Sequence, residues 1–212
     1  MISVFVNLFT IVFYYFLIFG VLFDRKSLTI KINIMDSINQ NQEEKNHEDL
    51  NNQEAVKKIK DLVSTAESCF FCTNLKSNEP FATRPMAVQK VDDEGNLWFL
   101  SSVDSHKNEE LKDNDAVQLL FQGDPHTDFM SIFGHATVSK DQAKIDELWN
   151  PLLKTWFTEG KEDPRITVIK VTPSESYYWD SKHGKYVAFA KMALGAVLGK
   201  TLDDSIEGKL NP

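Results

Sequence analysis

The chain has little arginine, little cysteine and none of the short motifs that mark the common enzyme classes. Its 23 basic residues include just three arginines, Arg25, Arg84 and Arg165, and its 212 residues include 2 cysteines. The sequence contains no GxSxG, HExxH, P-loop or GxGxxG motif, which removes the usual grounds for a hydrolase, a zinc protease, an NTPase or a Rossmann enzyme. The 5 histidines have no tight ligand spacing, so we expect no metal site.

The charge balance excludes a second group of functions. The formal net charge is -8 and the pI is about 5.1. Such a chain has no overall basic field, which argues against nucleic acid or an anionic membrane surface as the main partner. A local basic pocket stays compatible with this balance.

The two cysteines, Cys69 and Cys72, form a CxxC within the run "CFFCTNL". This run is apolar and aromatic and reads as a strand, in which residues three apart point to opposite faces. Neither a second CxxC nor a histidine pair accompanies it, so two buried thiols are favoured over a thioredoxin-like or zinc role. Two cysteines make no disulfide framework, which fits a reducing, cytoplasmic location.

The first 52 residues differ in composition from the rest. Residues 1–23 carry no charge and are long enough for a helix that crosses a bilayer of about 30 Å. Two interpretations stay open: a membrane anchor with the domain on the cytosolic side, or a translation start at Met35. We favour Met35 because nothing downstream needs an anchor. The expected divisions are an apolar segment (1–34), a disordered polar leader (35–52), one folded domain (53–180), and a C-terminal helix and tail (181–212).

Hydrophobic periodicity predicts a mainly β domain. Apolar residues recur at three- and four-residue spacing over 53–68, which is typical of an amphipathic helix. Strand-like runs then follow with short helices between them. The expected strands are 69–75, 81–91, 97–101, 116–121, 129–139 and 166–171, and the expected helices are 104–112, 141–157 with a break near Pro151, and 186–202. About six short strands without βαβ alternation favour a closed or split β-barrel with helices at its edges.

Arg84 is the first candidate for chemistry, because it lies mid-strand in "FATRPMAVQK". Burying a guanidinium is costly unless an anion meets it. A structural ion pair or an outward-facing charge is the alternative. Pro85 cannot donate to a ladder, so this position should be a sheet edge or a bulge, where backbone can approach a ligand.

A second candidate cluster lies in "WFLSSVDSHK", where a strand ends in Ser101 and Ser102 and a helix begins near Ser105, His106 and Lys107. Hydroxyls, free amides at a helix N-terminus and a lysine together suit a phosphate dianion. The alternative is simple helix capping by Ser105 with solvated neighbours.

Together, "ATRPMAV" and "LWFLSSVDSHKNEELKDNDAVQLLF" resemble the general stress protein group of the pyridoxamine 5'-phosphate oxidase-like superfamily. The resemblance runs from about residue 54 to residue 180 in order, spacing and residue type. It implies an FMN-binding split barrel of Greek-key antiparallel strands, paired as a homodimer with FMN at the interface.

The resemblance also implies roles for individual residues. Arg84, Ser105 and Lys107 would hold the FMN phosphate together with Ser101, and His106 stands where the oxidases often have arginine. Trp179 would reach the flavin from the neighbouring subunit. Met86 and the backbone after it, with Leu100 and Ser101, would lie along the flavin and ribityl chain. The remaining cofactor-binding positions would be Pro85, Ala87 and Ser102.

Two departures from the family pattern bear on activity. A flavin-contacting glutamine of the true oxidases falls close to Phe129 here, and no arginine follows Arg165 to hold the vitamin phosphate, which His183 alone cannot do. These differences argue against pyridoxamine phosphate oxidation. The sequence therefore predicts an FMN-dependent oxidoreductase that uses NAD(P)H or another small donor, with a non-catalytic FMN-storage or stress-sensing protein as the alternative.

Overall fold

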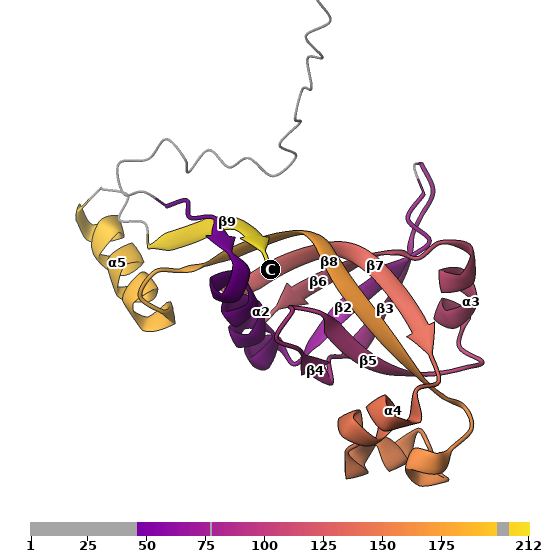
Figure 1. The fold of residues 1–212 in the computed structure, drawn as a ribbon. Helices are drawn as coiled ribbons and strands as arrows, with labels where there is room; N and C mark the ends of the chain where they lie inside the picture. The colour runs from indigo at the N-terminus through magenta and orange to yellow at the C-terminus, as the bar shows by residue number, and fades with distance from the viewer. Residues whose placement is uncertain (1–45, 77, 199–203) are drawn as a thin grey trace, which may run out of the picture. The chain divides into compact units, whose positions relative to one another are not determined.

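The computed structural model describes residues 46–76, 78–198 and 204–212 (Figure 1). The predicted apolar segment and the first part of the predicted leader lie outside the described residues. The strands are β1 (Leu50–Asn51), β2 (Ser68–Thr73), β3 (Ala82–Ala87), β4 (Lys90–Val91), β5 (Leu97–Ser102), β6 (Ala116–Gln122), β7 (Phe129–Ser139), β8 (Ile166–Ser181) and β9 (Ser205–Asn211). The helices are α2 (Asn52–Ala66), α3 (His106–Asp113), α4 (Gln142–Leu148) and α5 (Lys185–Leu198), with 3-10 turns η2 (Pro151–Thr155) and η3 (Gly160–Glu162). None of these helices is long and apolar enough to cross a membrane.

The strands form one curved sheet in the order β1-β9-β8-β7-β6-β2-β3, with β5 paired to β8 and β4 paired to β5. The strands β3 and β4 are separated by just two residues, Val88 and Gln89, yet they lie at opposite ends of this arrangement. The sheet therefore curls back on itself without closing. The predicted fold class, a mainly β split barrel with helices at its edges, is confirmed.

The long strand β8 organises this curvature, as its sweep in Figure 1 shows. Its first half pairs with β5 and its second half with β9, while β7 follows it on the other side across an irregularity between Phe133 and Gly134. A side chain at position 134 would lie 2.4 Å from the Thr172 carbonyl oxygen, so glycine lets the two backbones come together there.

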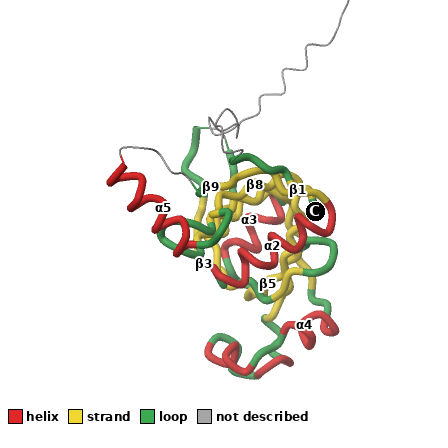
Figure 2. Tube along the Cα trace, turned by 90° about the vertical axis from the view of Figure 1, so that its left-hand side faces the viewer, coloured by secondary structure: helices red, strands yellow, loops and turns green. Residues whose placement is uncertain are grey.

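The interior of the barrel is apolar. Phe71 of β2 meets Phe99 of β5 edge to face, with ring centroids 5.2 Å apart, so strands that are not hydrogen-bonded neighbours meet through their side chains. The apolar face of α2 packs into the same core through Ala55, Ile59 and Leu62. Figures 1 and 2 place α2 and α3 at opposite ends of the barrel.

A smaller apolar cluster lies outside the barrel, under α4 and η2. Ile145, Leu148 and Leu153 pack there against Leu100 and Ile166. The predicted break near Pro151 is confirmed, because α4 ends at Leu148 and η2 begins at the proline.

Four sequence predictions need correction. The predicted strand 81–91 is two strands with a bend between them, and the strand predicted to end at residue 171 continues to Ser181. The C-terminal tail contains a strand, β9, that periodicity missed. The end of the predicted disordered leader is ordered, because Leu50 and Asn51 pair in parallel with Leu210 and Asn211. The polar leader becomes a strand because β9 offers it a free backbone edge.

Cys69 and Cys72 are both buried and both free, as predicted. Cys69 faces the barrel core, and its burial, followed by the nearby Cys72, raises its thiol pKa. Cys72 instead accepts a hydrogen bond from Thr83 Oγ1 at 3.5 Å. Within the described part of the chain no group of side chains has the composition of a metal site.

We expect the double variant Cys69→Ser, Cys72→Ser to retain its flavin, because both thiols are buried and the pKa of Cys69 is raised, which makes them a poor redox pair. Its free energy of unfolding should fall by about 1 to 3 kcal/mol for each hydroxyl buried without a partner. Flavin absorbance and urea unfolding of the purified variant would measure both. Loss of activity on alkylation of these two thiols alone would contradict the expectation.

Candidate functional site

Arg84 lies on β3, the edge strand of the sheet, which confirms the edge position inferred from Pro85. Its Nη1 donates to Glu110 Oε2 of α3 at 2.8 Å, and Thr73 donates to the same carboxylate oxygen. The hydrogen bond from Arg84 is the main cause that lowers the pKa of Glu110. Among the described residues, the remaining N–H groups of Arg84 have no acceptor. The ion-pair alternative is therefore realised, while most of the guanidinium stays available.

Lys107, on the first turn of α3, is 9% exposed. Burial lowers the pKa of this lysine, and the positive charge of Arg84 lowers it further. In the part of the chain that the structure describes, its ammonium group has neither a hydrogen bond nor an ion pair. Burying a cation that forms no ion pair is costly, and an anion at this end of the barrel would offset that cost.

The serines belong to a hydroxyl network beside these cations. Ser101 Oγ lies 3.1 Å from Ser105 Oγ and donates to Asn108 Oδ1 at 3.1 Å. Asn108 in turn donates to Thr167 Oγ1 at 2.9 Å and to the Ser102 carbonyl oxygen at 3.0 Å. The Ser105 side chain does not cap α3, although Ser105 is its N-cap residue. Simple capping is therefore not what Ser105 does here.

The structure thus brings Arg84, Ser101, Ser105 and Lys107 to the α3 end of the barrel, and we call these four residues the basic-hydroxyl cluster. His106 and Ser102 lie at its rim. His106 is exposed, and the Ser102 hydroxyl donates to Asp104. Sequence reasoning missed Glu110, Thr73 and Asn108, which hold the cluster together.

Comparison with known proteins identifies the family. A family model described as pyridoxamine 5'-phosphate oxidase like matches residues 54–203. The chain belongs to this pyridoxamine 5'-phosphate oxidase-like family.

Three individual proteins are similar to this chain. Protein bli-3 of Neurospora crassa is 29% identical over 155 residues, which cover 68% of this chain and 74% of that protein. The solved structure of a general stress protein 26 from Jannaschia sp. has a TM-score of 0.61 at 19% identity, covers 74% of this chain and 97% of its own, and supports the fold alone. The general stress FMN/FAD binding protein from Xanthomonas citri is 28% identical with a TM-score of 0.50, and covers 57% of this chain and 84% of its own.

The residues that the sequence analysis expects along the flavin lie on two faces. Arg84 and Met86 share the inner face of β3, whereas Pro85 and Ala87 are exposed on its outer face. Leu100 packs into the small cluster under α4, on the face of β5 opposite to Ser101. Its side chain therefore does not join the basic-hydroxyl cluster, and the expected contact from Leu100 is restricted to its backbone.

Trp179 does not join the cluster within one chain. It lies on β8 opposite Phe129, and its ring centroid is 4.8 Å from that of Tyr177. The next residue, Asp180, is ion-paired to Lys58 of α2, at the far end of the barrel from α3. Along β8, about 40 Å of strand separates Trp179 from Thr167, the partner of Ser101.

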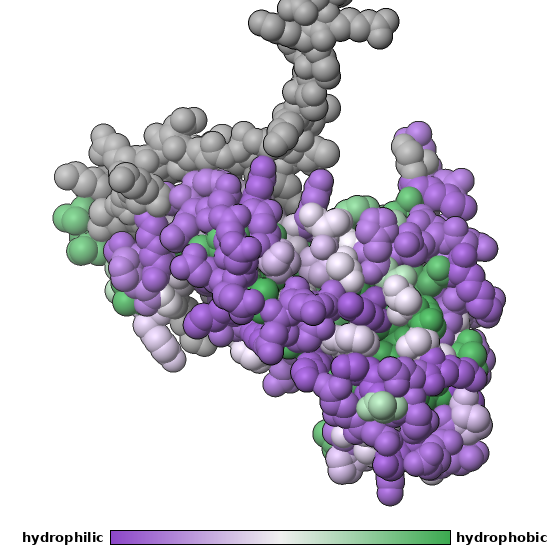
Figure 3. All heavy atoms as spheres, viewed as in Figure 1, coloured by the Kyte–Doolittle hydropathy of each residue, from purple (hydrophilic) through white to green (hydrophobic). Residues whose placement is uncertain are grey.

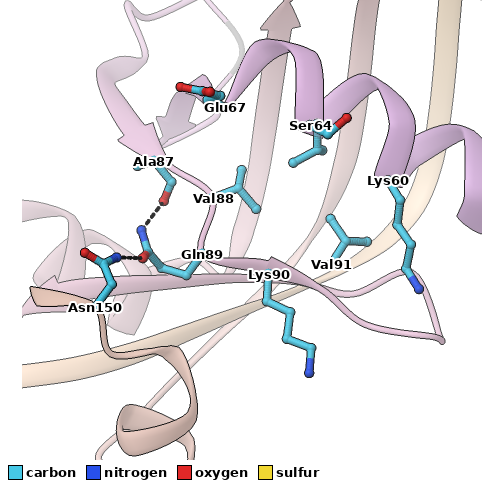
Figure 4. Close-up of a pocket in the computed structure, with 10 residues that line it drawn as sticks. Lys60, Ser64, Glu67, Ala87, Val88, Gln89, Lys90, Val91 and Asn150 are labelled. Carbon is cyan, nitrogen blue, oxygen red and sulfur yellow. Dashed lines mark hydrogen bonds between the residues drawn. The ribbon is translucent and has the colours of Figure 1, made fainter. Parts of the chain in front are cut away.

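A pocket of about 470 Å³ lies between α2 and the β3–β4 bend (Figure 4). Asn150 donates to Gln89 Oε1 at 3.2 Å there, and Gln89 donates to the Ala87 carbonyl oxygen at 3.2 Å. Both lysines at its rim, Lys60 and Lys90, are already ion-paired, to Asp93 and Glu147. This pocket therefore lacks the unpaired buried cation that distinguishes the basic-hydroxyl cluster.

Proposed function

We propose that this chain binds FMN and that the basic-hydroxyl cluster holds its phosphate. The single observation that carries the proposal is the largely buried side chain of Lys107, whose ammonium group has no hydrogen bond and no ion pair among the described residues. A phosphate dianion would supply a counter-ion and would accept from the serine hydroxyls next to it. The name of the Xanthomonas citri relative, an FMN/FAD binding protein, adds support.

Each member of the cluster would have a distinct part in binding. The unpaired N–H groups of Arg84 can donate to two phosphate oxygens at once, while its Nη1 stays with Glu110. Lys107 would contribute a point charge, and the first amides of α3 would add donors. Asn108 orients Ser101 through its hydrogen bond.

We further propose that the protein is an FMN-dependent oxidoreductase that takes electrons from NAD(P)H or another small donor. FMN when bound would supply the redox chemistry, and the protein would supply position and electrostatic stabilisation. The carboxylate that contacts the cluster directly, Glu110, is held by Arg84 and Thr73. Because this carboxylate is already engaged and is not an obvious acid or base, flavin storage or sensing without turnover is the second candidate.

The first test is the identity of the flavin, and the second is its reduction. Mass spectrometry of the flavin released from the purified protein would distinguish FMN from FAD. Anaerobic addition of NADPH or NADH should then bleach the flavin absorbance if the protein is an oxidoreductase. A bound flavin that neither donor nor other small reductants bleach would favour storage, and a protein that takes up no flavin would overturn both candidates.

We also propose a homodimer with FMN at its interface, to which Trp179 of the partner subunit contributes. The distance of Trp179 from the cluster within one chain supports this arrangement, because a two-fold axis would bring opposite ends of two barrels together. A cytoplasmic location is our further proposal, supported by two free cysteines. Nucleic acid and, for the described domain, membrane are not expected partners.

The affinity for FMN should fall as the pH rises into the alkaline range, at a lower pH than it would for an ordinary lysine with a pKa near 10.4. The lowered pKa of Lys107 means that its ammonium group loses its proton, and with it the attraction for phosphate, in this range. Fluorescence titration at each pH measures the effect. The Lys107→Arg variant, which stays charged, should keep its affinity across the range; an equal fall in both proteins would contradict the assignment.

A further inference from the structure

Glu110 on α3 places a carboxylate beside the cations that are proposed to hold a phosphate. Its Oε2 accepts from Arg84 Nη1 at 2.8 Å, and the side chains of Glu110 and Arg84 are 25% and 23% exposed. Glu110 lies three residues after Lys107 on the same helix. The surface around α3 is hydrophilic, as the purple atoms at the right of Figure 3 show, where Figure 1 places the helix. A negative charge therefore lies next to the place proposed for the flavin phosphate.

Glu110 is held in this place by two strands. Thr73 of β2, which is fully buried, donates to the same Oε2 that accepts from Arg84 of β3. The hydrogen bond from Thr73 does not depend on Arg84, so the carboxylate stays at the cluster when the guanidinium binds a second anion. Glu109, by contrast, is an exposed residue of the same helix that pairs with Lys112 three residues later. Glu110 thus joins α3 to the edge of the sheet, whereas Glu109 is an ordinary surface carboxylate.

The charges of this group are partly balanced before any ligand binds. The hydrogen bond from Arg84 is the main cause that lowers the pKa of Glu110, so the carboxyl group is ionised at neutral pH. Burial is the main cause that lowers the pKa of Lys107, whereas the negative charge of Glu110 raises it. Two positive charges and one negative charge leave an excess of one positive charge, which is half of what a phosphate dianion needs. The dianion would have to share Arg84 with Glu110 and would be repelled by it.

We propose that Glu110 competes with the flavin phosphate for Arg84, and that this competition keeps bound FMN exchangeable with FMN in solution. The inference rests on the proposed function and adds a residue that limits affinity. In the empty site Glu110 balances the charge of Arg84, and in the loaded site it repels the phosphate. The repulsion grows with the negative charge of the ligand, so it is largest for a phosphate dianion and absent for riboflavin.

The variant Glu110→Gln tests the proposal, because it removes the charge and keeps the shape. The amide oxygen can still accept from Thr73 and from Arg84. Fluorescence titration should give an FMN dissociation constant about tenfold lower than in the parent protein, because the repulsion between carboxylate and phosphate is gone. Release of FMN, followed by stopped-flow fluorescence, should be slower to match. Riboflavin should have the same dissociation constant in both proteins.

The matched control is Glu109→Gln, which removes the same charge from the same helix. Because Glu109 is exposed and paired with Lys112, this variant should leave the FMN dissociation constant unchanged. Equal gains in the two variants would mean that the net charge of the protein is the cause, and they would overturn the proposal. Weaker binding of FMN by Glu110→Gln would overturn it as well, because Glu110 would then orient Arg84 for the phosphate.

Thermal unfolding gives a second readout that a purely structural part of Glu110 would not produce. Without FMN, Glu110→Gln should unfold at a lower temperature than the parent, because Arg84 and Lys107 lose the negative charge near them. The rise in unfolding temperature on addition of FMN should be larger in the variant than in the parent. An equal rise in both proteins would mean that Glu110 only stabilises the fold.

Inorganic phosphate separates failure of this proposal from failure of the proposed function. If the parent binds FMN and Glu110→Gln binds it no more tightly, the competition is wrong and the flavin site stands. If neither protein binds FMN but Glu110→Gln binds inorganic phosphate more tightly than the parent, the flavin assignment is wrong and the competition for Arg84 stands. Calorimetric titration measures the binding of phosphate. A parent and a variant that bind neither ligand would overturn both proposals.

Discussion

Replacing Lys107 by alanine should weaken FMN binding about ten- to a hundredfold, which corresponds to a charge-assisted contact worth about 1.5 to 3 kcal/mol. The size of the effect follows from burial, since the proposed contact between Lys107 and the phosphate would be little screened by water. Arg84→Ala should lose at least as much, because it also leaves Glu110 as an uncompensated negative charge beside the phosphate. Fluorescence titration with FMN measures both losses.

The controls for this prediction come from the same helix and from the ligand. Lys112→Ala removes a lysine of α3 that is exposed and paired with Glu109, and it should change FMN affinity little. Riboflavin, which has no phosphate, should bind weakly to the parent protein and almost equally to Lys107→Ala. Unchanged FMN affinity in both Arg84→Ala and Lys107→Ala would remove the phosphate assignment.

Replacing Trp179 by alanine should lower FMN affinity by about tenfold and weaken the dimer at the same time. The tryptophan is remote from the basic-hydroxyl cluster of its own chain, so a contact with flavin must come across the interface. Flavin binding and association are then linked, and each should strengthen the other. Light scattering over a range of protein concentrations, with and without FMN, measures the coupling.

Trp156→Ala is the matched control for Trp179→Ala. Trp156 is an exposed tryptophan at the end of η2, whereas Trp179 lies in the second half of β8. Trp156→Ala should leave both FMN affinity and association unchanged. A monomer of the parent protein that binds FMN tightly would refute the shared site, whatever the result for Trp179→Ala.

The candidate site was predictable in its parts because its residues belong to two short segments. Two short segments can be recognised from their residue types alone. One is the strand with Arg84 and Pro85, and the other is the strand-to-helix turn with Ser101, Ser105 and Lys107. The partners of these residues were not predictable. Glu110 is 26 residues from Arg84 in the sequence, and Thr167 is 59 residues from Asn108. Hydrophobic periodicity does not predict contacts between residues so far apart.

The fold shows the same division between local and long-range information. Alternation and helical spacing predicted most strands and α2, because those patterns arise from one buried face of each element. They did not predict β1 and β9, which are polar. β9 forms because it pairs with the second half of β8, and β1 forms because β9 then supplies a backbone edge 160 residues away in the chain.

By itself, the sequence determined the fold class, the apolar core and the residues that can contact a phosphate. Hydrophobic periodicity and side-chain chemistry are properties of short segments, so they can be read without the tertiary structure. The tertiary structure alone decided three things: that β3 and β4 bend apart at Val88 and Gln89, that Ser101 and Lys107 lie beside Arg84, and that Trp179 lies at the other end of the barrel. The physical reason is the register of β8. Its pairing with both β5 and β9 sets the curvature of the sheet, and curvature is a property of many strands together.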